Sequence, residues 1–206
     1  MSMFNEAEAR TILDKVVKLS KADECTATLE GSIEGNVRFA LNNISTSGIV
    51  SDTALAVTAA YGQRSGTATV NEFDDASLER VVRRAEELAR LAPENPEYMP
   101  VLEKQTYKPS PTFNPAVAAI TPEYRAKVAA ESIGPCRAEK MVAAGFETDS
   151  QRFSAFANSN GNFGYQQETR FDYTCTVRTG DERGSGWVGR SVADTGQFDV
   201  ASDIRT

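Results

Sequence analysis

Apolar side chains near the start of the chain recur with the period of an amphipathic helix. Between Phe4 and Lys21 they fall at i, i+3, i+4, i+7 and i+8, at Ala9, Ile12, Leu13, Val16 and Val17. Polar residues occupy the opposite face, which is typical of a helix that buries one stripe. The pattern predicts a helix over residues 4–21.

The spacing then changes to alternation, which indicates strands with one buried face. Three alternating sets follow: Cys25, Ala27 and Leu29; Val37, Phe39 and Leu41; Leu55, Val57, Ala59 and Tyr61. Turns are predicted at 31–35, 51–52 and 62–66, where glycine, serine and aspartate gather. With a fourth strand over 67–72, these segments predict an antiparallel meander.

Helical spacing returns after Asp74 and Asp75, and either side chain can cap the free N–H groups of a helix. The apolar positions are Leu78, Val81, Val82, Ala85, Ala89 and Ala92, and Pro93 ends the helix. Paired catalytic carboxylates are the alternative interpretation of the two aspartates. A helix start explains both residues without a further assumption.

Seven of the eight prolines lie between Pro93 and Pro122. Because proline breaks both helices and central strands, this stretch is predicted to be a linker or an ordered connection. A third helix is predicted to begin at Thr121 and Pro122. Gly134-Pro135 is expected to kink or break it, and Gly145 to follow its end.

The rest of the chain has the pattern of β-structure. We predict a strand over 146–157, a hairpin turn at 158–161, a long strand near 170–178 and a return strand over 185–191. In the long strand, Phe171, Tyr173, Cys175 and Val177 alternate with an outward row of Arg170, Asp172, Thr174, Thr176 and Arg178.

Residues 196–204 resemble an aspartate-capped helix that has just begun. Short isolated helices are unstable in water, so the second half is expected to be an incomplete domain. The prediction is an α+β fold with helices packed on twisted, mainly antiparallel sheets in two segments. Residues 1–108 form the N-terminal domain, 109–120 a Pro-rich linker, and 121–206 the start of a second, truncated domain.

Composition narrows the functional classes. The net charge is −7 and the basic residues are interleaved with acids, which argues against a nucleic-acid partner. The N-terminus lacks the regions of a signal peptide, and no apolar run approaches the ~18 residues of a membrane span. The dispersed Cys25, Cys136 and Cys175 predict free thiols in a reducing compartment. We therefore expect a cytoplasmic protein without membrane or nucleic-acid partners.

The sequence has no histidine, the residue on which most zinc sites and nucleophile pairs depend. We therefore predict no catalytic centre and no metal site in this chain. Residues 184–189 match G-x-G-x-x-G. Trp187 and Val188 lie in a strand-like segment, and no helix opens there, so the context of a dinucleotide fingerprint is missing.

Six residues are candidates for contacts with a partner or peptide. Asn158, Ser159, Asn160 and Gly161 can form a contact loop, or can simply supply the conformations that a hairpin turn needs. Arg170 and Arg178 end the outward row. That row can line a groove or accept an added strand, or it can be a plain solvated face.

The order of these motifs resembles the TldD/PmbA family, the candidate modulators of DNA gyrase. The similar segments are 54–62 (ALAVTAAYG), 64–69 (RSGTAT), 75–85 (DASLERVVRRA) and 153–161 (FSAFANSNG). They follow one another in the family's order over essentially the whole chain. Residues 58–61 depart from the Arg-containing stretch of many members, so the subgroup stays open.

The resemblance implies cytoplasmic proteins that act as paired subunits, either homodimers or heterodimers with a paralogous subunit. Members are linked to maturation of a peptide antibiotic and to antitoxin degradation, so peptides or unfolded proteins are the implied substrates. One subunit type carries a zinc-binding H-E-x-x-x-H helix, which would lie after Thr206. The implied zinc therefore belongs to a full-length parent, and this chain needs no cofactor.

Our first hypothesis is a non-catalytic N-terminal portion of a metallopeptidase-family protein, which shapes the substrate channel and the subunit interface. The second is a non-enzymatic PmbA-like partner subunit or peptide-binding module. The third is a direct modulator of DNA gyrase. Because the chain has a net charge of −7, this third role requires contact with a basic protein surface rather than with DNA.

Overall fold

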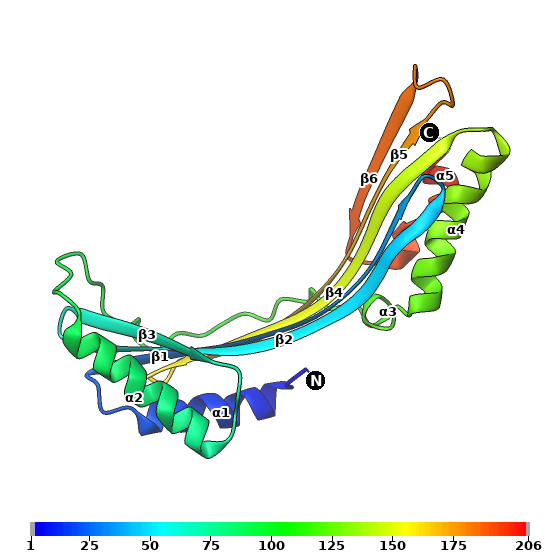
Figure 1. Cartoon of the computed structure of the whole chain (residues 1–206). Helices are drawn as coiled ribbons and strands as arrows, with labels where there is room; N and C mark the ends of the chain where they lie inside the picture. The colour runs from blue at the N-terminus through cyan, green and yellow to red at the C-terminus, as the bar shows by residue number, and fades with distance from the viewer. Residues whose placement is uncertain (1–2, 205–206) are drawn as a thin grey trace. The chain divides into compact units, whose positions relative to one another are not determined.

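The computed structural model describes residues 3–204, and long antiparallel strands form its framework (Figure 1). The described residues form one six-stranded sheet in the order β3-β2-β1-β4-β5-β6. Its strands are β1 (Glu24–Ala40), β2 (Asn43–Tyr61), β3 (Arg64–Val70), β4 (Val142–Asn158), β5 (Phe163–Arg178) and β6 (Ser185–Val192). The predicted α+β class is confirmed, with one sheet in place of the sheets expected in two segments.

Helices occupy the intervals between the strands. They are α1 (Glu6–Leu19), α2 (Asp75–Leu91), α3 (Pro115–Ala118), α4 (Pro122–Ala138) and α5 (Val200–Asp203), with a 3-10 turn at Thr195–Gln197. The predicted caps are confirmed at Asp74, Thr121 and Asp199, whose side chains accept hydrogen bonds from backbone N–H groups of the first turn. No helix of the described part is long and apolar enough to cross a membrane.

The chain forms two compact units, and each gathers segments that are distant in sequence. Unit 1 contains the residues up to Gly31, Asp52–Ser110 and Phe153–Gln166. Unit 2 contains Ser32–Ser51, Pro111–Arg152 and the residues from Gln167 onward. Both units take segments of β1, β2, β4 and β5 because these strands run through both. The sequence-continuous domain bounds proposed above remain a prediction.

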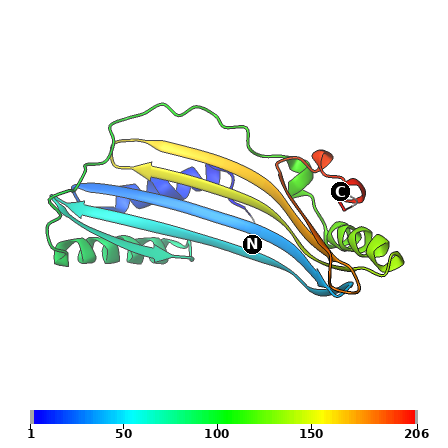
Figure 2. The ribbon, with the colours of Figure 1, turned by 90° about the horizontal axis from the view of Figure 1, so that it is seen from above.

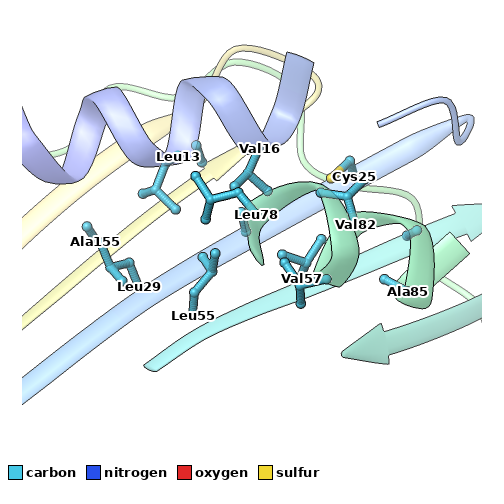
Figure 3. Packing of buried hydrophobic residues seen from close by; sticks show 14 of the residues in the cluster. Leu13, Val16, Cys25, Leu29, Leu55, Val57, Leu78, Val82, Ala85 and Ala155 are labelled. Atoms are coloured by element: carbon cyan, nitrogen blue, oxygen red, sulfur yellow. The ribbon is translucent and has the colours of Figure 1, made fainter. Parts of the chain in front are cut away.

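Unit 1 has its core between two helices and the sheet. Leu13 and Val16 of α1 and Leu78 of α2 lie against the strand side chains in Figure 3. The strands contribute Cys25, Ala27, Leu29, Leu55, Val57, Ala59, Phe153, Ala155 and Ala157, all buried. The predicted helical and alternating patterns therefore describe this core correctly.

Unit 2 buries a second apolar cluster under α4. Val128, Ala129 and Ile133 of α4 belong to the same cluster as Phe171, Tyr173 and Cys175 of β5. The Tyr173 hydroxyl lies 2.7 Å from the Ser132 hydroxyl, so this buried phenol has a polar partner. The inward positions predicted for the long strand are confirmed at 171, 173 and 175.

Two predicted turns are wrong, because β1 continues through 31–35 and β2 through 51–52. Close packing explains the glycines there. A Cβ on Gly31 would lie 2.3 Å from the Phe153 ring, and one on Gly35 would lie 1.8 Å from the Arg125 guanidinium. These glycines make room for neighbouring side chains in a strand rather than bending the chain.

Of the two alternatives predicted for the third helix, a kink or a break, the break is wrong, since α4 continues through Gly134 and Pro135 to Ala138. The kink stays a prediction. A residue before proline normally resists helical angles because its Cβ meets the proline ring, and glycine has no Cβ. Gly145 does not follow a helix end but lies inside β4. A Cβ on it would meet the Phe39 ring and the Thr174 carbonyl oxygen, each at 2.4 Å.

Gly66 of β3 brings the strand against the backbone of α2, and this contact predicts a large effect. A Cβ at this position would lie 2.3 Å from the Ala89 nitrogen and 2.7 Å from the Ala85 carbonyl oxygen. We expect Gly66→Val to lower the free energy of unfolding by about 3 kcal/mol, since helix backbone cannot rotate away. Urea unfolding measures this loss. Gly186→Ala is the control, because nothing lies within 4 Å of its Cβ position. Equal effects of the two substitutions would contradict the prediction.

Candidate functional site

The polar turn after β4 is built by its own hydrogen bonds. The Asn158 side-chain oxygen accepts from the backbone N–H groups of Asn160 and Asn162, both at 3.1 Å. Ser159 bonds to the backbone of Cys25 twice, through its N–H at 2.9 Å and its hydroxyl oxygen at 3.3 Å. Gly161 has φ +79°, which confirms the predicted need for a left-handed residue. The turn is therefore fixed within unit 1.

The amide groups of this turn bind part of the Pro-rich connection between α2 and α3, which is the long green coil in Figure 2. We call residues 98–107 of this connection the strap. We call the side chains of Asn158, Asn160 and Asn162 the Asn clamp. The Asn162 amide donates to the carbonyl oxygens of Leu102 at 2.8 Å and Glu103 at 3.2 Å. Its oxygen accepts from the Gln105 N–H at 2.6 Å.

The other two asparagines hold the same part of the strap. Asn160 donates to the carbonyl oxygens of Val101 at 3.1 Å and Leu102 at 3.3 Å. Asn158 donates to the Leu102 carbonyl at 3.3 Å. Three side-chain amides thus converge on a short run of main chain of the same polypeptide. A contact of this turn with a partner or a separate peptide stays a prediction.

Two anchors tie down the ends of the strap. The Tyr98 hydroxyl donates to the Glu24 carboxylate at 2.5 Å, and the Val101 N–H donates to the same oxygen at 3.2 Å. Burial and this carboxylate raise the pKa of Tyr98 to about 12. At the other end, the Tyr107 ring packs edge-on against Phe156, 5.3 Å between centroids.

Arg170 and Arg178, the other predicted contact residues, lie in unit 2 on the outward face of β5. Arg170 forms an ion pair with Asp172 at 2.8 Å, and Arg178 is exposed opposite Ser185 of β6. Trp187 of β6 stands opposite Thr176 on this face and is 70% exposed. The two groups of predicted contact residues belong to different units, the Asn turn to unit 1 and the arginines to unit 2.

Unit 2 also holds a buried charged cluster that the sequence did not reveal. Arg125 of α4 binds Asp149 of β4 in a bidentate pair, with Nε to Oδ1 at 2.6 Å and a terminal nitrogen to Oδ2 at 2.9 Å. Both residues are buried. The missing side chain of Gly35 leaves the space that the guanidinium fills.

Glu147 lies two residues before Asp149 and is fully buried. Neither of its carboxyl oxygens has a hydrogen-bond partner among the described residues. Burial, and then the charge of Asp149, raise the pKa of Glu147 to about 8, while Arg125 opposes the shift. Two charged carboxylates cannot hydrogen-bond to each other, so a proton on Glu147 gives the pair its missing donor. Burial raises the pKa of Tyr124, and the nearby carboxyl groups of Glu147 and Asp149 raise it further.

A pocket of about 340 Å³ opens beside this cluster within unit 2. Arg125 is its one cationic lining residue. The other lining residues are Asn36, Val37, Ile44, Ser47, Gly48, Ile49, Pro122 and Ala126. The pocket is therefore mainly apolar.

Four residues of these clusters were not among the predicted site residues, namely Asn162, Glu147, Asp149 and Arg125. For the two acids a signal exists, because the odd positions of β4 face inward, as Phe153 and Ala155 show. A strand register anchored on those residues would have placed both acids inside. Asn162 continues the i, i+2 spacing of the other asparagines. Nothing in the helical pattern of α4 distinguishes Arg125 from exposed arginines.

The residues described here do not fit the zinc that the family resemblance implies for a full-length parent. The sequence has no histidine, and the described residues contain no group of three or more Cys, Asp or Glu placed to hold a metal ion. The three cysteines are buried and free, and burial raises the pKa of each.

Two family models match the chain. The PmbA/TldA metallopeptidase domain 1 matches residues 27–89, and the PmbA/TldA metallopeptidase central domain matches residues 117–203. Together they cover most of the sequence. The chain belongs to the PmbA/TldA metallopeptidase family, as the motif order predicted.

Solved structures share the fold. TldE from Thermococcus kodakarensis superposes with a TM-score of 0.84 at 17% identity, over 95% of this chain and 45% of that one. A candidate modulator of a DNA gyrase from Thermotoga maritima gives 0.82 at 12% identity, over 95% of this chain and 46% of the other. A candidate modulator of DNA gyrase from Bacteroides thetaiotaomicron superposes with a TM-score of 0.80 at 14% identity, over 98% of this chain and 49% of the other. The chain therefore spans about half the length of these structures. No curated protein matches the sequence.

Proposed function

We propose that this chain is the non-catalytic front portion of a TldD/PmbA-type protein that acts in proteolysis or peptide maturation. The observation that carries the proposal is the match to both the first and the central metallopeptidase-family domains in the family's order. The chain spans about half of the related structures, so the proposed catalytic residues belong to the remaining part of a longer polypeptide.

In this proposal the chain shapes the substrate channel and the interface between paired subunits in the cytoplasm. The Asn clamp supports a role in handling peptides, because it binds main chain in an extended conformation. The exposed face with Trp187 and Arg178 supports a role in contacts between proteins. The partner is a second copy or a paralogous subunit.

The test compares two polypeptides on a fluorescent peptide substrate with added zinc. We expect no hydrolysis by the 206-residue chain, and chelator-sensitive hydrolysis by a polypeptide that continues the sequence through an H-E-x-x-x-H helix. Hydrolysis by the 206-residue chain that a chelator abolishes would overturn the proposal. A continuation without that motif supports the PmbA-like partner function instead.

Modulation of DNA gyrase is the second candidate, favoured by the descriptions of two of the related structures. A direct role requires that immobilised chain retain purified gyrase subunits at physiological salt. With a net charge of −7, the contact must be to a basic protein surface. Absence of retention would remove this candidate.

A further inference from the structure

We propose that the pocket beside Arg125 is a binding site for a small neutral molecule that has an apolar body and one carboxamide group. The pocket lies wholly in unit 2, and the proposed function does not use it. Its volume of about 340 Å³ is at the lower end of the range for ligand pockets. At about 30 Å³ for each non-hydrogen atom, a ligand of about ten such atoms fills it.

The walls of the pocket come from a helix and two strands. Pro122, Arg125 and Ala126 stand at i, i+3 and i+4 of α4, so they share one face of this helix. The strands β1 and β2 supply the remaining lining residues, which are Asn36, Val37, Ile44, Ser47, Gly48 and Ile49. A site built on regular elements needs little ordering when a ligand binds.

Two isoleucines of the pocket are exposed although their side chains are apolar. The strand β3 pairs with Leu55–Tyr61 of β2, so within the described residues the earlier part of β2 has β1 as its one neighbouring strand. Ile44 is 47% exposed and Ile49 is 57% exposed. An apolar ligand body that covers them removes this surface from water, which favours binding.

Arg125 offers a hydrogen-bond donor that the fold leaves unused. Its guanidinium has five N–H bonds, and those to Asp149 come from Nε and one terminal nitrogen, Nη2. No described residue accepts a hydrogen bond from the other terminal nitrogen, Nη1. Within the described residues, only the two carboxyl oxygens of Glu147 are both fully enclosed and unpaired, so Nη1 reaches open space. Because Arg125 lines the pocket, a ligand there can accept from Nη1.

Charge selects a neutral ligand over an anion. Arg125 is already paired with the Asp149 carboxylate, so the pair has no net charge. A ligand carboxylate would be a second anion on one guanidinium, where little water screens the repulsion. The raised pKa of Glu147 shows the same resistance to a further negative charge. A carboxamide oxygen accepts the hydrogen bond without adding charge, and Asn36 supplies a side-chain carbonyl for the NH₂ group of the ligand.

The experiment follows the binding of three probe molecules to the isotope-labelled 206-residue chain by NMR at pH 7. Cyclohexanecarboxamide combines an apolar ring with a neutral amide. Cyclohexanecarboxylate has the same ring with a charged group, and acetamide has the amide without the ring. The backbone amide signals of Gly48, Ile49 and Ala126 report occupation of the pocket.

We expect these signals to shift with cyclohexanecarboxamide at a Kd of about 1 mM, the affinity of a small fragment. The carboxylate should bind at least about tenfold more weakly, because it adds a second negative charge. Acetamide should also bind at least about tenfold more weakly, because it buries no apolar ring.

Two neighbouring substitutions on β2 test the location. Ile49→Ala removes part of the apolar wall and should weaken the binding of cyclohexanecarboxamide about fivefold. Val50→Ala is the matched control, because Val50 is 63% exposed and does not line the pocket, and it should change the affinity by less than about twofold. Both side chains are exposed, so both variants should fold.

The double variant Arg125→Met with Asp149→Leu tests the donor. It should weaken the binding of cyclohexanecarboxamide at least about fivefold, because the amide oxygen then lacks its partner. No shift of the three amide signals up to about 10 mM cyclohexanecarboxamide would overturn the proposal. Tighter binding of the carboxylate, or equal losses in Ile49→Ala and Val50→Ala, would overturn it as well.

Discussion

Replacing Asp149 with alanine should lower the free energy of unfolding by about 3–5 kcal/mol, because it leaves the Arg125 guanidinium buried without its counterion. The side chains of the pair are only 6% and 10% exposed, so solvent cannot replace the lost carboxylate. Urea unfolding measures the effect as a lower midpoint at an unchanged slope.

Two further variants separate an unpaired charge from a general loss of packing. Glu34→Ala removes one side of the exposed Arg152–Glu34 pair in the same unit and should cost less than about 1 kcal/mol. The double variant Arg125→Met with Asp149→Leu removes both charges and should be closer to the original chain than Asp149→Ala alone. A double variant that is less stable than the single one would contradict this explanation.

Rising pH should destabilise the chain through Glu147, in the opposite sense to an ordinary ion-paired carboxylate. Its carboxyl has a reference pKa of 4.5, which burial and Asp149 raise to about 8 in the folded protein. Between these values the folded chain holds a proton that the unfolded chain has released. The stability from this group is fully present below the lower value and is lost as pH rises through the higher one, at up to about 1.4 kcal/mol per pH unit.

Glu147→Gln isolates this effect, because the amide is neutral at every pH and can still donate to Asp149. We expect the variant to be as stable as the original chain near pH 4.5 and several kcal/mol more stable near pH 8.5. Glu131→Gln, on the exposed side of α4, is the control and should leave the pH profile unchanged. Parallel pH profiles for the original chain and Glu147→Gln would show that Glu147 is charged in the fold.

The elements were largely predictable from local pattern. The spacing of Leu13 and Val16 in α1 and the alternation around Tyr173 in β5 each report one buried face, and the structure confirms both. The errors came from glycines. Gly31, Gly35 and Gly145 sit in strands because a neighbouring side chain needs their space, and that neighbour is distant in the sequence.

The candidate site was only half predictable for a related reason. The turn at 158–161 carries its own signal, but the segment that it binds lies about 56 residues earlier and has no motif. The Arg125–Asp149 pair likewise joins a helix to a strand 24 residues away. A single sequence shows which side chains can donate and accept, whereas the fold alone decides which of them meet.

Trp187 provides an intrinsic fluorescence signal. It is the sole tryptophan, it is 70% exposed, and it stands on β6, the last strand of the sheet. Its fluorescence should therefore have the red-shifted emission of a hydrated indole. A surface that covers this end of the sheet would shift the emission to the blue. One wavelength scan can thus report contact of another subunit with this strand without any label.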